Sequence, residues 1–113
     1  MKTQAEAAVA KPPLEVLEAR AEEAAALLAS MANAKRLLVL CHLLEGERSV
    51  GELAEIAGLS QSALSQHLAK MRLQALVRTR RDGQTIYYSL ASPAVRAVLE
   101  TLYGIYCSAP GAP

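Results

Sequence analysis

Two thiols are the side chains of this 113-residue chain best suited to covalent chemistry. Cys41 lies within a strongly apolar stretch, and Cys107 lies close to the end of the sequence. A single cysteine on an apolar helix face is most often a small, inert hydrophobic side chain, which is the ordinary interpretation of Cys41 taken alone. Cys107 is expected to be the more accessible thiol, and accessible thiols are oxidised first.

His42 and His67 are the only histidines in the chain. Neighbouring helical residues point about 100° apart, so Cys41 and His42 cannot easily bind one metal ion, and we expect His42 to be structural or exposed. His67 either donates to a nucleic-acid phosphate or packs against the β-hairpin that follows its helix, and the sequence favours neither. No Ser/His/Asp set, paired carboxylates or phosphate-binding glycine loop is present, so we do not expect an enzyme.

Residues 53–76 contain the pattern of two helices joined by a tight turn. Gly58 suits the left-handed conformation that ends the first helix, and Ser60 suits the N-cap of the second. One face of the second helix is apolar and predicted to be buried, with Leu64, Leu68, Met71 and Ala75. The opposite face begins with Gln61, Ser62, Ser65 and Gln66, short hydrogen-bonding groups of the kind that read base edges. This arrangement is typical of a helix-turn-helix with its recognition helix.

Positive charge is concentrated just after this motif. Residues 60–90 contain five basic side chains and one acidic one, a net +4, whereas the whole chain carries +1. Residues 77–81 and 84–90 predict a β-hairpin whose turn is Asp82-Gly83, and Arg80 and Arg81 at its tip would reach phosphates or the adjacent minor groove. The predicted DNA-binding residues are Ser60, Gln61, Ser62, Ser65, Gln66, His67, Lys70, Arg80 and Arg81.

The remaining elements form one domain over residues 13–108, between tails at 1–12 and 109–113. A helical pattern starts at Leu14 and continues as one helix through Leu28, and Asn33 caps a second helix that ends near Gly46. Ser49 with Glu52 forms a capping box for the third. The last helix, from Pro93 to about Ser108, is so apolar that a second copy of the chain is expected to cover it in a symmetric dimer. The predicted fold is mainly α: about five helices and a two-stranded wing.

Composition agrees with a small DNA-binding module. The chain is 52% hydrophobic but contains no Phe and no Trp, so a thin core and a partner subunit are expected. No apolar run is long enough for a membrane span or a secretory signal. We therefore expect a cytoplasmic protein, in which cysteines are usually thiols or redox-active rather than permanent bridges.

The segment S-Q-S-A-L-S-Q-H-L, followed by L-V-R-T-R-R-D-G-Q-T-I-Y-Y-S-L, resembles the ArsR/SmtB family of winged-helix repressors across residues 14–107. The resemblance implies a homodimer held by the first and last helices. It also implies a near-palindromic double-stranded operator that is released when an inducer arrives. Neither common metal site of the family is present, because the start of the third helix lacks a thiol and the last helix has Glu100 but no histidine.

The remaining cysteine pair resembles the sulfide-responsive branch of that family, whose members repress genes such as that for sulfide:quinone reductase. The resemblance implies that persulfide or polysulfide oxidises Cys41 and Cys107 and links them through sulfur, with Cys41 the more reactive thiol and Cys107 the resolving one. No resident cofactor or metal is expected. The alternatives are a metal- or haem-responsive repressor using the same cysteines, and a winged helix that binds proteins instead of DNA.

Overall fold

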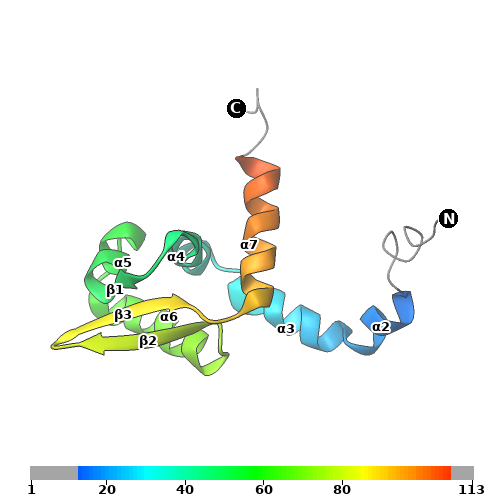
Figure 1. Ribbon diagram of the computed structural model, residues 1–113, viewed down its shortest axis with the longest axis horizontal. Helices are drawn as coiled ribbons and strands as arrows, with labels where there is room; N and C mark the ends of the chain where they lie inside the picture. Colours follow the sequence, from blue (N-terminus) through cyan, green and yellow to red (C-terminus); the bar gives the residue numbers. More distant parts are fainter. Residues whose placement is uncertain (1–12, 108–113) are drawn as a thin grey trace.

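The computed structural model describes residues 13–107, and its described part contains six helices and one three-stranded antiparallel sheet (Figure 1). The helices are α2 (Leu14–Ala19), α3 (Ala21–Met31), α4 (Ala34–Glu45), α5 (Val50–Ala57), α6 (Gln61–Leu73) and α7 (Pro93–Tyr106). The strands are β1 (Arg48–Ser49), β2 (Val77–Asp82) and β3 (Thr85–Leu90), arranged in the order β1-β3-β2. The predicted helix-turn-helix, α5–α6, and the wing that follows it are confirmed.

The helix boundaries follow local capping chemistry. The Asn33 side chain accepts hydrogen bonds from the backbone N–H groups of Lys35 and Arg36, and the Ser49–Glu52 capping box is complete. Gly58 adopts the left-handed conformation, with φ 66° and ψ 37°, and the Ser60 side chain accepts from the Ala63 N–H. Each cap satisfies backbone groups that a helix end leaves unpaired, which explains why these boundaries are visible in the sequence.

The core lies between α4, α5, α6, the start of α7 and the inner face of the sheet. The side chains with the least exposure come from all of these elements. They include Val39, Leu40, Leu43, Leu53, Leu64, Leu68, Met71, Val77, Tyr88, Leu90, Val95 and Leu99. In Figure 1, α7 and the α2–α3 pair extend away from this body.

The prediction of one continuous first helix is wrong. The chain forms α2 and α3, separated at Arg20, whose backbone lies at φ −117° and ψ 19°. The last turn of α2 tightens, because the Arg20 N–H donates to the Leu17 carbonyl, three residues earlier, at 3.0 Å. No Gly or Pro marks this break, so the apolar periodicity could not locate it.

The wing differs from its prediction in two ways. A third strand, β1, pairs with β3 through Arg48↔Tyr88 and Ser49↔Tyr87, and two residues are too few to show a strand period. The two-residue loop is Gly83-Gln84, because Asp82 pairs with Thr85. Gly83, the first loop residue, has φ 64°. One type of two-residue hairpin loop requires positive φ only at this first position, so Gln84 can follow without adopting positive φ.

The ends of α6 and α7 also required correction. α6 ends at Leu73, so Ala75 does not share its buried face; Ala75 is exposed and has φ 61°. α7 ends at Tyr106, with Cys107 as its C-cap, and the predicted extension to Ser108 and both predicted tails lie outside the described residues. No single helix among residues 13–107 is long and apolar enough to cross a membrane; α3 and α4 pass that test only when counted together, and they are bent by 92°.

Candidate functional site

The exposed face of α6 presents the predicted base-reading groups as one surface. Gln61, Ser62, Ser65, Gln66 and Lys70 are all exposed, and their spacing places them on the same side of the helix. Leu64, Leu68 and Met71 on the opposite side are fully buried and anchor α6 to the core. The helix therefore holds a polar surface rigidly outward, as a recognition helix must.

The turn before α6 is held by a contact that the sequence did not predict. The ammonium of Lys35 donates to the Ala57 carbonyl, at the C-terminus of α5, at 2.6 Å. A cation at a helix C-terminus is favourable, whereas Lys35 occupies the N-terminal turn of its own helix, α4, where a cation is unfavourable. This local mismatch was the available signal that Lys35 has a tertiary partner.

His67 is half-buried on α6 and contacts α4. Its Nδ1 accepts a hydrogen bond from Arg36 Nε on α4 at 3.2 Å, and another guanidinium nitrogen of Arg36 donates to the Ser30 carbonyl at the end of α3, also at 3.2 Å. The sequence did not predict this contact, which uses Nδ1 and leaves both predicted roles of His67 open. Arg36 therefore joins α3, α4 and the recognition helix at one half-buried point.

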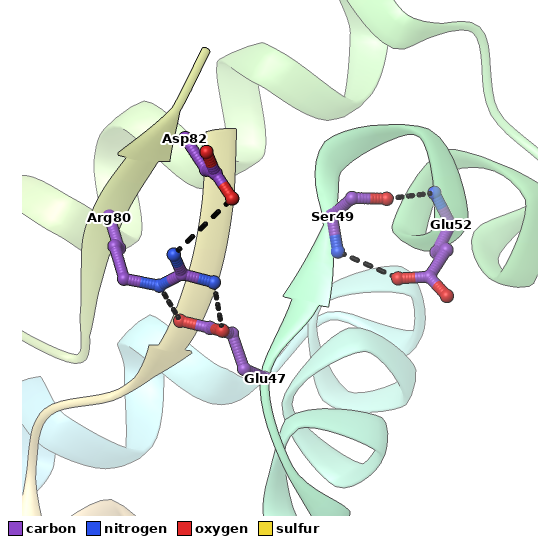
Figure 2. A network of polar contacts seen from close by, with 5 residues as sticks. All are labelled: Glu47, Ser49, Glu52, Arg80 and Asp82. Carbon is purple, nitrogen blue, oxygen red and sulfur yellow. Dashed lines mark hydrogen bonds and ion pairs between the residues drawn. The ribbon is translucent and has the colours of Figure 1, made fainter. Parts of the chain in front are cut away.

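The two wing arginines have different surroundings. Arg80 forms a bidentate pair with Glu47, at 3.0 and 2.7 Å, and its guanidinium lies 4.6 Å from the centre of the Tyr87 ring. Figure 2 shows Arg80 between Glu47 and Asp82, the latter at 4.0 Å. Arg80 lowers the pKa of Glu47 through this hydrogen bonding, so Glu47 stays ionised and offsets the charge of Arg80. Arg81 is exposed and points to the opposite face of the strand.

Cys41 and Cys107 are brought together on the wall of one cavity between α4 and α7. Both are exposed free thiols, although they are 66 positions apart in the chain. The cavity has a volume of about 580 Å³. It is lined by Leu37, Cys41, His42, Leu44, Glu45, Leu99, Leu102, Tyr103, Tyr106 and Cys107. The sequence had left open whether the two thiols share one side of the molecule, and the fold places them together.

The environment of Cys41 does not activate it. Partial burial raises its pKa, and the neighbouring Cys107 raises that pKa further, because a second thiolate nearby would repel the first. A thiol with a raised pKa is less ionised at neutral pH and so reacts more slowly as a nucleophile. This finding runs against the assignment of Cys41 as the more reactive thiol.

His42 also lines the cavity, half-buried, beside Cys41. Within residues 13–107, however, no three His, Cys, Asp or Glu side chains are grouped closely enough to hold a metal ion. The described geometry thus offers two thiols with one imidazole nearby and an apolar wall, a setting suited to sulfur chemistry.

Comparison with known proteins places this architecture in a family. The model of the bacterial regulatory protein arsR family matches residues 33–79. The transcriptional activator HlyU of Vibrio cholerae is 50% identical over 96 residues, 85% of this chain and 89% of HlyU. The structure of reduced HlyU from Vibrio cholerae matches with a TM-score of 0.78 at 49% identity, over 83% of this chain and 99% of that one.

Two further solved structures agree. The transcriptional repressor BigR from Xylella fastidiosa matches with a TM-score of 0.80 at 39% identity, covering 86% of this chain and 99% of BigR. The homodimeric winged helix-turn-helix DNA-binding domain of Mb0332 from Mycobacterium bovis matches with a TM-score of 0.68 at 28% identity, over 78% of this chain and 82% of that domain. The chain therefore belongs to the ArsR family, and it is a DNA-binding transcriptional regulator and not an enzyme.

Proposed function

We propose that this chain acts in the cytoplasm as a homodimeric repressor that senses reactive sulfur through Cys41 and Cys107. In the reduced state it binds a near-palindromic operator with its two recognition helices. Persulfide or polysulfide links the two thiols through sulfur, and the operator is released. The observation that carries the proposal is the shared cavity of two thiols that lie far apart in the sequence.

The proposed order of the sulfur chemistry is based on the surroundings of Cys41. Because its surroundings favour the protonated form of Cys41, we assign the first attack to Cys107 and the closing attack to Cys41. A direct disulfide requires Cα atoms within about 7 Å, and an inserted sulfur chain relaxes that requirement. Preference for sulfane sulfur over peroxide would then depend on the separation of the thiols.

The link can reach the DNA-binding surface through α4. Cys41 lies on α4, and the first turn of the same helix holds the helix-turn-helix through Lys35 to the Ala57 carbonyl and through Arg36 to His67. Joining α4 to α7 therefore biases the position of α6 if one dimer geometry accommodates the link better. An allosteric coupling of about 1–3 kcal/mol would be typical.

Exposed apolar side chains on the projecting helices support a dimer. Leu14, Val16 and Leu17 on α2, Leu28 on α3 and Ile105 on α7 are all more than half exposed. An open groove of about 730 Å³ also separates α3 from the start of α7. Apolar surface of this kind on two arms of one chain suits burial against a symmetric copy, as in the homodimeric relative.

The test combines mass spectrometry with operator binding on reduced and polysulfide-treated protein. We expect an intramolecular sulfur bridge between Cys41 and Cys107 and a 5- to 150-fold loss of affinity, the range of a typical allosteric coupling. Cys41→Ser should bind DNA normally and not respond. Full loss of binding with an unmodified Cys107 would end the model, and release by Zn²⁺, Cu⁺ or haem without a bridge would support the metal or haem alternative.

A further inference from the structure

The thiol cavity is larger and more apolar than a sulfur bridge requires. Its volume of about 580 Å³ falls within the range of about 300–1,000 Å³ seen for small-molecule sites. Besides the thiols, His42 and Glu45, its wall consists of leucine and tyrosine side chains: Leu37, Leu44, Leu99, Leu102, Tyr103 and Tyr106. A few sulfur atoms would leave most of this space empty, so the wall has room for an organic substituent.

The charges that line the cavity favour uncharged sulfur donors over anionic ones. Among residues 13–107, no Lys or Arg lines the cavity, and the one lining carboxylate, Glu45, is exposed and pairs with Arg48 at 3.0 Å. An anionic donor would find no Lys or Arg on this described wall and would lose hydration against leucines. An uncharged donor with apolar substituents would lose nothing comparable and would gain from burial.

Resting on the proposed function, we propose that this cavity binds uncharged organic trisulfides, R–S–S–S–R with apolar R groups, as the sulfur donors that close the Cys41–Cys107 bridge. Leu102 and Tyr106 of α7 and Leu37 and Leu44 of α4 contact the R groups. Both thiols line the cavity, Cys41 from α4 and Cys107 from the C-cap of α7, so in this proposal one bound molecule contacts both.

The reaction balances within one donor molecule. The thiolate of Cys107 attacks the central sulfur, one sulfur–sulfur bond of the trisulfide breaks, and R–S⁻ leaves and takes up the proton that Cys107 lost. The thiolate of Cys41 then attacks the same sulfur and displaces the second R–S⁻, which takes up the proton from Cys41. Two protein thiols are oxidised to a Cys107–S–S–S–Cys41 bridge, and the trisulfide is reduced to two R–SH molecules.

The test measures by mass spectrometry the rate at which dimethyl, diethyl and dipropyl trisulfide form the Cys41–Cys107 bridge. Each rate is divided by the rate at which the same trisulfide reacts with free cysteine, which corrects for its intrinsic reactivity. Burial of one methylene is worth about 0.8 kcal/mol, so the ratio should rise about fourfold for each methylene that the cavity accepts. Glutathione trisulfide, which is anionic, should show a ratio at least tenfold below that of the dipropyl compound. Inorganic tetrasulfide serves as the donor without substituents.

Two leucine variants provide the controls. In Leu102→Asn, the rate ratio should no longer rise with the length of the R group, while inorganic tetrasulfide should still form the bridge. Leu73→Asn, at an 88% exposed position outside the cavity, should leave the dependence of the rate ratio on R-group length unchanged. If the rate ratio of the unmodified protein does not rise from dimethyl to dipropyl trisulfide while tetrasulfide still forms the bridge, this inference alone is overturned. The same result is expected if a second copy of the chain covers the cavity, and it overturns the inference in that case too. Absence of bridging with every donor overturns the proposed function as well.

Discussion

Arg81, and not Arg80, should carry the electrostatic contact of the wing with DNA. Glu47 already offsets the charge of Arg80 through two hydrogen bonds of 3.0 and 2.7 Å, and Arg80 also lies against the Tyr87 ring. Arg81 pairs with Ile86 in the sheet register and so lies on the face of the sheet that packs on the helices, including α6. Between residues 13 and 107, no carboxylate forms a salt bridge with Arg81.

The magnitude follows from counterion release. Each phosphate contact contributes about 0.9 to the slope of log K against log salt concentration, so Arg81→Gln should reduce the slope by about 1.8 in a dimer with two wings. Between 50 and 200 mM salt, the unmodified protein should therefore lose about 12-fold more affinity than the Arg81→Gln variant. The assay is fluorescence anisotropy with one operator duplex at a series of KCl concentrations.

The matched control removes the neighbouring pair without changing the local net charge. The Glu47→Gln/Arg80→Gln double variant should keep the slope of the unmodified protein, whereas Glu47→Gln alone should make the slope steeper by releasing Arg80. Equal reductions in slope for Arg81→Gln and for the double variant would refute the reasoning, because Arg80 would then be a phosphate contact of equal value.

Three further predictions concern stability and reactivity. Arg36→Gln removes the hydrogen bonds to His67 and to the Ser30 carbonyl and should lower the free energy of unfolding by about 2 kcal/mol in urea; an unchanged midpoint would show that the junction of α3, α4 and α6 is unimportant. Gly58→Ala places a Cβ no closer than 3.8 Å to Lys35 Nζ, so only the cost of the left-handed backbone, about 1 kcal/mol, should appear in thermal unfolding. The raised pKa of Cys41 keeps its thiol protonated to higher pH in the folded chain, so its alkylation should increase at higher pH than in urea-unfolded protein. Cys107→Ala should move that profile part of the way back, and an identical profile in both proteins would mean that the thiols do not interact.

Local signals explain what could be predicted from the sequence alone. Asn33, Ser49, Gly58 and Ser60 mark helix ends through hydrogen bonds and backbone conformations that involve only neighbouring residues. The alternation along residues 85–90 and the concentration of positive charge are likewise local patterns. For that reason the helix-turn-helix, the wing and the exposed polar face of α6 could be predicted.

Tertiary structure decided every contact between distant parts of the chain. The partners Arg36 and His67 are 31 residues apart, and Glu47 and Arg80 are 33 apart. The cavity that both Cys41 and Cys107 line exists only because α4 packs against α7. Periodicity indicates which face of a helix is apolar, but not which helix covers it or at what rotation, so only the packed core could bring the two thiols to one cavity.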